Sequence, residues 1–467
     1  MTDTAALDVE HLAHGVGALA EECVVVRHTA GAPHIAAVLA VPGAAAPAVR
    51  RATALYAEAD DSGLALFEPD DHLMLFHRNR READFLYREV FRDNEYLRNG
   101  ITLPERPTVV DVGANVGGAS VLFGLVRPCA RLFALEAVPH LCRAVELNAR
   151  LHGIDLVVVP GAVGERRHRT RFTYYPKNTA MSGLLADPTD RDVLKTYLAG
   201  EGDEAVTEGL DTVVGELLAG ESLECEVRTL GEALQGHGID RIDLLKIDVE
   251  KAEWQVLRGI DDGLWRRIDQ VVMEVHDIDG RVAACVSLLE AKGFGVLVDR
   301  NPDLLDTDMY GVYARRGPLA PDSTAPPWRT PLSTRRALAS ALRAALGGEF
   351  TDLPVDRFRF LAALPRDDRG TLDTAALLAR IPTDPPAGPD PRPGIEEQLA
   401  AIWRQVLKVE HITASDDFFD LGGTSLKSVR MVLEVDEVFG ENVLPPDQLF
   451  TGSRFHEVAA VIRRNLG

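Results

Sequence analysis

Several features that define large classes of proteins are missing from this sequence. Its 467 residues include only five cysteines, an odd number with no C-x-x-C pair. Such a set indicates buried thiols in a reducing compartment, and neither a disulfide framework nor a zinc site. No basic-then-apolar signal segment opens the chain, and no apolar run is long enough to span a membrane. We therefore expect a cytoplasmic protein.

The sequence also has fewer basic residues than acidic ones. Lysine and arginine total 50 against 72 aspartates and glutamates, which gives a net charge of -22. Nucleic acid and anionic membrane surfaces would repel such a chain, so both are excluded as partners. The hydrophobic content of 46% is typical of a globular protein, and the length predicts two to four domains.

The N-terminal piece of the chain is too small to fold alone. Its pattern predicts a helix at residues 7–14 and two apolar strands at residues 21–26 and 35–41, joined as a hairpin. One hairpin and one helix cannot bury enough apolar surface. We expect the missing half later in the chain, in an amphipathic helix at residues 335–346 and a strand at residues 357–363, because loop tips tolerate insertions.

A glycine turn follows the first buried strand of the central domain. Residues 108–118 read Thr-Val-Val-Asp-Val-Gly-Ala-Asn-Val-Gly-Gly and lead into a predicted helix at residues 119–126. Gly113 and Gly117 allow the backbone to approach a ligand at the carboxyl end of the first strand of a doubly wound sheet. The spacing G-x-N-x-G lacks the third glycine of the dinucleotide fingerprint, which argues against a nicotinamide oxidoreductase.

The next predicted strand ends in an acid. Residues 131–136 finish at Glu136, where a carboxylate can accept hydrogen bonds from both hydroxyls of a ribose. Ribose recognition without a full pyrophosphate loop favours a nucleoside cofactor such as S-adenosylmethionine.

Two later strands also end in polar residues. Asp248 and Glu250 follow an apolar strand that starts at Ile242, and residues 271–277 form a strand that ends in His276 and an acid. Each of these residues alone fits a helix cap, a turn or a structural histidine. Their coincidence at the same edge of a parallel sheet favours a functional site.

A serine near the C-terminus follows a pair of glycines. Residues 416–427 read Asp-Asp-Phe-Phe-Asp-Leu-Gly-Gly-Thr-Ser-Leu-Lys, and an apolar-periodic helix follows. Ser425 is thus predicted at a helix start, where the dipole and free N–H groups favour a phosphate. No histidine is placed in sequence to act as its base, so the pattern indicates a modification site and not a nucleophile.

These C-terminal residues, from about Ile395 onward, resemble the carrier (thiolation) domain of nonribosomal peptide synthetases. The resemblance implies an all-α four-helix domain with 4′-phosphopantetheine attached to Ser425. It also implies three kinds of partner: a phosphopantetheinyl transferase, an adenylating enzyme or module that loads the arm, and a downstream condensation domain.

The central motifs resemble the FkbM-type methyltransferase family, through the turn after residue 110, the Glu136 strand, residues 160–163 and residues 246–253. The resemblance implies a Rossmann-like α/β domain that binds S-adenosylmethionine, with the aromatic residues of 85–91 and 172–175 as candidate lids. Lys251 departs from the family, since many members carry glycine there, and we expect it to affect the substrate side. Carried over by position, the expected cofactor-binding residues are Asp111, Gly113, Asn115, Gly117, Glu136, Ala162 and Asp248, and the expected catalytic residues are His276, Asp248 and Glu250, with no metal.

The pieces on either side of the central domain are similar to the small C-terminal subdomain of an adenylation domain. Residues 364–373 resemble that family's final motif, but Thr371 stands where the family has its catalytic lysine. Threonine supplies no cation to stabilise an adenylate, and the large nucleotide-binding subdomain is absent from the sequence, so we expect no amino-acid activation. The predicted division is 1–42 first adenylation part, 43–70 linker, 71–316 methyltransferase, 317–334 linker, 335–380 second adenylation part, 381–394 linker and 395–467 carrier.

The sequence therefore predicts an enzyme that methylates, on oxygen or nitrogen, an aminoacyl or acyl group tethered to the carrier, with a weak preference for oxygen. One alternative is a carrier and docking protein in which the methyltransferase fold is an idle scaffold. A smaller variant of the enzyme hypothesis adds a metal held by Asp248 and Asp277.

Overall fold

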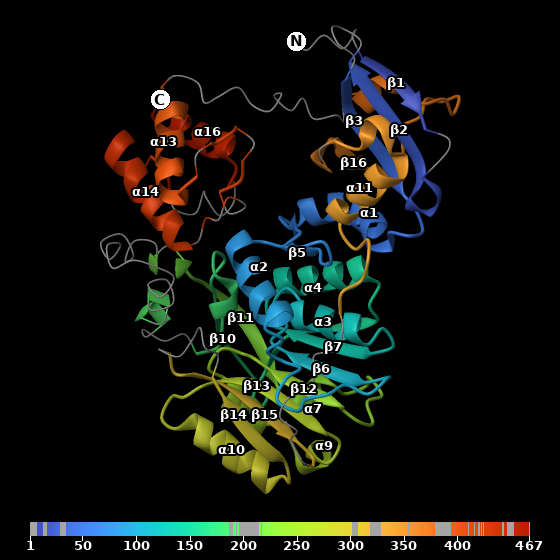
Figure 1. Ribbon diagram of the computed structural model, residues 1–467. Coiled ribbons are helices and arrows are strands. Elements are labelled where there is room, and N and C mark those ends of the chain that lie inside the picture. The colour runs from blue at the N-terminus through green and yellow to red at the C-terminus, as the bar shows by residue number, and fades with distance from the viewer. Residues whose placement is uncertain are drawn as a thin grey trace. The chain divides into compact units, whose positions relative to one another are not determined.

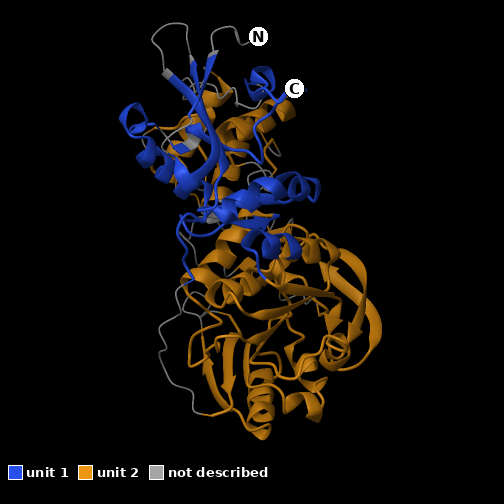
Figure 2. Cartoon of the chain, turned by 90° about the vertical axis from the view of Figure 1, so that its right-hand side faces the viewer, with its two compact units in different colours: residues 1–78, 146–154, 327–384 blue, residues 79–145, 155–326, 385–467 orange. Residues whose placement is uncertain are grey.

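The computed structural model describes most of the chain (Figure 1), as two compact units that are coloured separately in Figure 2. The first unit comprises residues 1–78, 146–154 and 327–384, and the second comprises residues 79–145, 155–326 and 385–467. No described helix is long and apolar enough to cross a membrane. The described residues are 7–12, 16–28, 34–185, 190–192, 194–195, 214–215, 217–300, 307–317, 328–353, 355–378, 394–409, 411–414, 416–418, 421, 423, 425–440, 443–445 and 453–466.

The first unit contains a four-stranded sheet in the order β1-β2-β3-β16. Its strands are β1 (Leu7–His11), β2 (Ala20–His28), β3 (His34–Pro42) and β16 (Phe358–Phe360). The helix predicted at residues 7–14 is wrong, because β1 pairs antiparallel with β2. Apolar Leu7 and Val9 alternate with Asp8 and Glu10, which is the period of a strand, and Val9 packs on the core.

Segments far apart in the sequence complete this sheet. β16 pairs in parallel with β3, with Phe358 opposite Val38. The core below includes Leu39 from the N-terminal part and Leu364 and Leu377 from the later part. Helix α11 (Arg335–Leu346) forms where the sequence predicts it, and the short helix α12 (Thr374–Leu378) follows. The two pieces therefore share one core, while their identity as an adenylation subdomain stays a prediction.

Residues 43–70, predicted to be a linker, are mostly ordered secondary structure. Helix α1 (Pro47–Asp61) begins with proline at its first turn and buries Val49, Ala52 and Leu55. Strands β4 (Ala65–Phe67) and β5 (Leu75–His77) then form an antiparallel pair. The prediction failed because alanine is a strong helix former even where its density suggests a linker.

The second unit contains the doubly wound sheet that the sequence predicts. Its seven strands run in the order β14-β15-β13-β12-β6-β7-β8, and all pairs are parallel except those of β15. The chain order reverses between β6 and β12, so the carboxyl ends of these strands meet at a topological switch point. The strands are β6 (Thr108–Val112), β7 (Arg131–Glu136), β8 (Leu156–Pro160), β12 (Leu244–Ile247), β13 (Gln270–His276), β14 (Gly295–Asp299) and β15 (Met309–Arg315).

Helices cover both faces of this sheet (Figure 1). Val110 and Val112 of β6 join a core with residues of the helices on one face, and Ala134 of β7 packs with Val145 on the other. Alternate residues of each strand thus enter separate cores. The first face carries α7 (Leu230–Ala233), α8 (Glu253–Arg258), α9 (Asp262–Trp265) and α10 (Arg281–Ala291); the second carries α3 (Gly118–Val126) and α4 (Pro139–His152).

Other segments extend the carboxyl edge of the sheet. Strands β9 (Ala162–Val163), β10 (His168–Tyr174) and β11 (Glu221–Arg228) form a small sheet in the order β10-β11-β9. Helix α2 (Arg80–Leu86) continues directly into a π-helix, η3 (Tyr87–Arg92), and a short turn of helix, η4, lies at Thr179–Met181. π-Helical turns are rare and are frequent at functional sites.

The C-terminal residues form a helical domain with its own core. Helices α13 (Ile395–Leu407), α14 (Ser425–Phe439) and α16 (Phe455–Leu466) pack around Trp403, Phe418 and Phe455. Ser425 is the first residue of α14, as predicted, although its side chain and Gly422 lie outside the described residues. A Cβ at Gly423 would lie 2.3 Å from the Phe418 ring, so this turn requires glycine. The number of four helices stays a prediction.

Candidate active site

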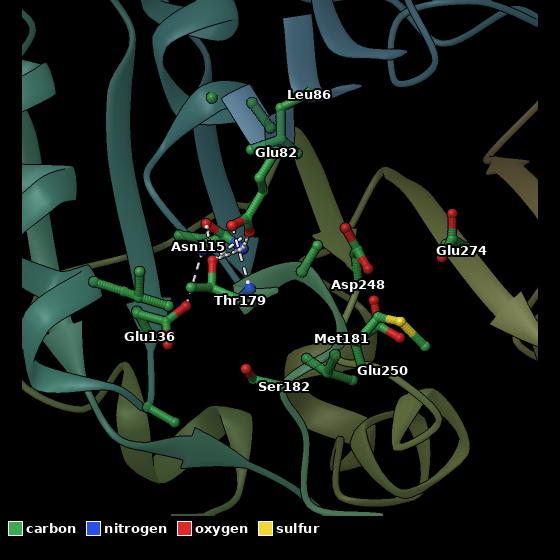
Figure 3. Close-up of a pocket in the computed structure, with 18 of the residues that line it drawn as sticks. Glu82, Leu86, Asn115, Glu136, Thr179, Met181, Ser182, Asp248, Glu250 and Glu274 are labelled. Atoms are coloured by element: carbon green, nitrogen blue, oxygen red, sulfur yellow. Dashed lines mark hydrogen bonds between the residues drawn. The ribbon is translucent and has the colours of Figure 1, made fainter. Parts of the chain in front are cut away.

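A cavity lies at the carboxyl ends of β6, β7, β12 and β13 in the second unit (Figure 3). Its walls also include α2, η3 and the segment around Thr179. The edge at which it forms is the one that the sequence predicts for a parallel sheet. Of the predicted site residues, Gly113, Asn115, Glu136, Ala162, Asp248, Glu250 and His276 line it, and Asp111 and Gly117 do not.

The turn after β6 passes very close to the end of β12. Gly113 and Gly117 have φ of 80° and 87°, and Asn115 has φ of 52°. A Cβ at Gly113 would lie 1.7 Å from the carbonyl oxygen of Asp248, which no side chain can accommodate. Glycine therefore lets two strand ends meet behind the cavity wall.

Glu136 presents a buried carboxylate at the end of β7. Its side chain accepts hydrogen bonds from the backbone N–H groups of Asn115 and Val138, both at 2.8 Å. Burial raises the pKa of Glu136 to about 7, although these N–H donors act in the opposite direction. Each carboxylate oxygen keeps a lone pair that can accept a ligand hydroxyl.

Asp111 does not contact the cavity, which corrects its predicted place at the cofactor. The residue is 1% exposed and accepts a hydrogen bond from Ser120 Oγ at 2.7 Å. Its other oxygen lies 3.1 Å from Lys246 Nζ, and Lys246 itself lines the cavity. Asp111 thus supports a lysine that the sequence analysis did not single out.

Lys246 connects the first turn to the acids. Its Nζ donates to the carbonyl oxygen of Gly113 at 2.7 Å and lies 3.3 Å from Asp248 Oδ2. Burial acts to lower the pKa of Lys246, but the carboxylates of Asp111 and Asp248 raise it further, so the ammonium stays charged. The hydroxyl of Tyr96 also donates to Asp248 Oδ2, at 3.0 Å.

Three acids converge on the opposite side of the cavity from Glu136 (Figure 3). One carboxylate oxygen from each of Asp248, Glu250 and Glu274 lies within 4.8 Å of the other two. His276 Nε2 lies 3.5 Å from Glu250 Oε2, and its Nδ1 lies 3.8 Å from Glu253 Oε1. The predicted catalytic residues are therefore brought together, with Glu274 added.

Crowding changes the protonation of this group. Burial, together with the charge of Asp248, raises the pKa of Glu250 to about 8 even though His276 acts to lower it. Burial lowers the pKa of His276, but Glu253 and Glu250 outweigh it and the net shift is upward. The pair Glu250–His276 therefore holds a proton near neutral pH that it can exchange with a ligand.

A buried acid connects two segments of the cavity wall through hydrogen bonds. Glu82 of α2 accepts hydrogen bonds from the hydroxyl and, at 3.2 Å, the backbone N–H of Thr179, and from Asn115 Nδ2 at 3.3 Å. These contacts hold α2 and η4 over the first turn. Of the predicted aromatic lids, Phe85 and Phe172 line the cavity, whereas the lining does not include Phe91 or Tyr175.

Two residues that the sequence analysis weighed lie elsewhere. Asp277 accepts a hydrogen bond from the backbone N–H of Val282 at 3.0 Å and thus caps α10. Lys251 is buried beside Asp190, outside the cavity lining, and has φ of 74°. Glycine would adopt the left-handed backbone at this position with less strain than lysine.

Glu274 is the main residue that sequence reasoning missed. It lies within β13, two positions before His276, so both side chains project from the same face of the strand. A glutamate inside an otherwise apolar buried strand was the available signal.

The comparisons with known proteins agree with this geometry. A family model described as "Methyltransferase FkbM domain" matches residues 111–296, and one described as "Phosphopantetheine attachment site" matches residues 397–462. The 31-O-demethyl-FK506 methyltransferase FkbM of Streptomyces tacrolimicus is 40% identical over 241 residues, which cover 51% of this chain and 92% of that protein. The chain belongs to the FkbM methyltransferase family. It is a methyltransferase fused to a carrier domain.

A longer relative matches most of the chain. The AMB antimetabolite synthetase AmbE of Pseudomonas aeruginosa is 34% identical over 423 residues, or 84% of this chain, but the match spans only 19% of that protein. A solved structure described as methyltransferase FkbM from Methylobacillus flagellatus aligns with a TM-score of 0.29 and 12% identity, over 45% of this chain and 44% of that one. The family assignment depends on the sequence relatives.

The two domains imply S-adenosylmethionine and 4′-phosphopantetheine as cofactors, and the residues present fit the first of them. The Glu136 carboxylate at the end of β7 can accept hydrogen bonds from a ribose. Gly113, after β6, has no side chain that would fill the space beside it. Apolar Leu135, Leu141 and Ala162 line the same part of the cavity and suit a planar base.

Proposed function

We propose that this enzyme methylates an aminoacyl or acyl group carried as a thioester on the phosphopantetheine arm of Ser425, during nonribosomal peptide biosynthesis. The observation that carries the proposal is the presence of both an FkbM methyltransferase domain and a carrier domain in one chain. The similarity to a stretch of a synthetase supports it. The proposal places the enzyme in the cytoplasm, with a phosphopantetheinyl transferase, a loading adenylating enzyme and a downstream condensation domain as partners.

The cofactor roles follow from the cavity. Glu136 accepts hydrogen bonds from the ribose hydroxyls, and the backbone of Ala162 contacts the adenine. The turn of Gly113 and Asn115, which Gly117 helps to shape, holds the methionine end beside Asp248. S-adenosylmethionine supplies the methyl group.

The acid and imidazole groups act on the acceptor. Asp248 orients the acceptor, which takes the methyl group and gives up one proton to the Glu250–His276 pair, whose atoms are 3.5 Å apart. Positioning the acceptor in line and excluding water provide the rest of the rate enhancement. Oxygen is the favoured acceptor, because the similar 31-O-demethyl-FK506 methyltransferase is named for an O-demethyl substrate.

The direct test is the intact mass of the carrier. The holo chain, loaded with a synthetic aminoacyl-pantetheine and given S-adenosylmethionine, is expected to gain the mass of one methyl group, and fragmentation would locate it. An unchanged mass in a chain that binds S-adenosylhomocysteine would contradict the proposal and favour an idle scaffold.

We predict that cofactor affinity depends on the protonation of Glu136. Burial raises the pKa of Glu136 to about 7, so the acid is mostly ionised at pH 8 and mostly protonated at pH 6. If the ribose needs the ionised form, the Kd for S-adenosylhomocysteine rises about tenfold between pH 8 and pH 6. Calorimetric titration would measure this.

Two variants serve as controls for that titration. Glu136→Gln should bind weakly at both pH values and lose the dependence. Glu226→Gln changes an exposed acid on β11 that pairs with Arg167, and this variant should keep the pH dependence. A pH dependence that persists in Glu136→Gln would assign the effect to another group.

We also predict that this chain does not activate an amino acid. Thr371 lies in an exposed turn, where its N–H donates to Asp367 Oδ1 at 2.9 Å, and it offers no cation. ATP–pyrophosphate exchange should stay at background for the chain and for its Thr371→Lys variant. Exchange above background in the unmodified chain would show that adenylation survives without the lysine.

A further inference from the structure

Four carboxylates, and not only three, meet on one side of the cavity. Asp248, Glu250 and Glu274 lie at or near the ends of β12 and β13, and Glu89 reaches the same cavity from the π-helix η3. Glu89 is only 8% exposed. Among the described residues, no hydrogen bond or ion pair reaches its carboxylate. A buried acid without a partner calls for a positive ligand.

The protein's own cations do not balance this charge. Lys246 lies 3.3 Å from Asp248, and its charge is shared with Asp111 and the carbonyl oxygen of Gly113. His276 lies 3.5 Å from Glu250 and 3.8 Å from Glu253, so the one charge of a protonated imidazole is shared as well. The four acids outnumber the positive charges that contact them, so a divalent cation compensates the excess better than a monovalent ammonium group.

The spacing of the oxygens also suits one ion. Ligand atoms on opposite sides of a cation are separated by about twice the bond length, or about 4 to 5 Å for Mg²⁺ and Ca²⁺. One oxygen from each of Asp248, Glu250 and Glu274 lies within 4.8 Å of the other two. All three are hard oxygen donors, with no thiolate among them, which favours Mg²⁺, Mn²⁺ or Ca²⁺ over zinc.

We propose that Asp248, Glu250 and Glu274 bind a divalent, oxygen-preferring cation, with Glu89 completing the negative cavity wall behind it. Open coordination positions of this ion face the cavity and hold the oxygen of the methyl acceptor. The positioning role depends on the function proposed above, whereas the binding of the ion does not. This site replaces the expectation of no metal, and it takes Glu274 in place of Asp277.

The backbone supports a built site. Glu250 has φ of 52° and Lys251 has φ of 74°, two consecutive non-glycine residues in the left-handed region. Such conformations cost roughly 1 kcal/mol or more each and concentrate at ligand-binding positions. The turn brings Glu250 back toward Asp248 and Glu274 on the neighbouring strand.

The test is a titration of the chelator-treated full chain with Mn²⁺ at physiological salt. Binding is measured as the loss of the electron paramagnetic resonance signal of free Mn²⁺. We expect one tight site per chain. Glu274→Gln should weaken that site by at least about tenfold, and Glu89→Gln by a smaller factor. Asp262→Asn, which changes an exposed acid on α9 paired with Lys292, should leave the site unchanged.

Calorimetry with S-adenosylhomocysteine on the same samples separates the possible failures. Glu274→Gln should keep the affinity of the parent, which shows that the variant is folded. Absence of a tight Mn²⁺ site in a chain that binds S-adenosylhomocysteine would overturn the ion and leave the methyltransferase standing. A chain that binds neither would overturn the proposed function as well.

A further experiment tests whether the acids bind the ammonium group of an aminoacyl substrate and not a metal ion. Aminoacyl-pantetheine and the matching acyl-pantetheine without its amino group are compared without metal. Equal affinities are expected. A clear preference for the amine, abolished in Glu274→Gln, would show that the acids bind substrate ammonium and would overturn the metal site.

Discussion

Replacing Ser425 with alanine is expected to abolish all methylation of the carrier. Phosphopantetheine is attached through a serine oxygen, and alanine provides no atom for that bond. Ser425 begins α14, a helix of 15 residues, whose N-terminus favours a phosphate. Intact mass after incubation with coenzyme A and a phosphopantetheinyl transferase should show the full gain for the parent and none for Ser425→Ala.

The control for this result is a serine away from the carrier. Ser287 lies on α10, and its hydroxyl donates to the carbonyl oxygen of Ala283 at 2.8 Å. Ser287→Ala should accept the arm like the parent. If Ser425→Ala still gained the mass of phosphopantetheine, another residue would carry the arm and the predicted attachment site would be wrong.

The same variant also tests whether tethering matters for methylation. Ser425→Ala should still methylate a soluble acyl-pantetheine, because its methyltransferase domain is unchanged, but only at high substrate concentration. An arm on the same chain presents its substrate at an effective concentration on the order of millimolar. Equal turnover of tethered and soluble substrate at micromolar concentration would argue against delivery by the carrier.

Replacing His276 with alanine is expected to lower turnover by about 10²- to 10⁴-fold, the usual range for loss of a general base. His276 is 7% exposed, lines the cavity and lies 3.5 Å from Glu250. Without the imidazole, the acceptor proton has only a crowded carboxylate to receive it. Single-turnover methylation of the loaded carrier would measure the loss of rate.

Cofactor affinity distinguishes a catalytic role of His276 from a structural one. S-adenosylhomocysteine should bind His276→Ala within about twofold of the parent, because Glu136 and Gly113, which we propose to hold the cofactor, are untouched. His168→Ala, which changes an exposed residue at the start of β10, should alter neither rate nor affinity. Turnover near that of the parent in His276→Ala would remove the residue from the mechanism.

The strands that build the site were predictable because each carries a local signal. The apolar runs before Gly113, Glu136 and Asp248 end in turns or acids, and the rule that parallel strands meet at one edge then places those residues together. The cavity residues Gly113, Asn115, Glu136, Asp248, Glu250 and His276 are indeed assembled at that edge.

Other parts of the site depend on contacts between residues distant in the sequence. Asp111 has the right position for a cofactor residue, yet it is paired with Lys246 from a neighbouring strand, 3.1 Å away. Glu82 and Thr179 are nearly a hundred residues apart in the sequence, yet hydrogen bonds join them in the cavity wall. Periodicity reports which face of a strand is buried but does not identify the partner across the sheet.

The sequence by itself determined the strands that build the site, the glycine turns and the serine at a helix start, because backbone propensity and hydrophobic period act over a few neighbouring residues. Only the tertiary structure decided which acids share one cavity. Glu89 and Glu274 line it together with Asp248 and Glu250, whereas Asp111 does not. These outcomes depend on side-chain direction and on charges brought together from different strands, and their electrostatic energy exists only once the chain has folded.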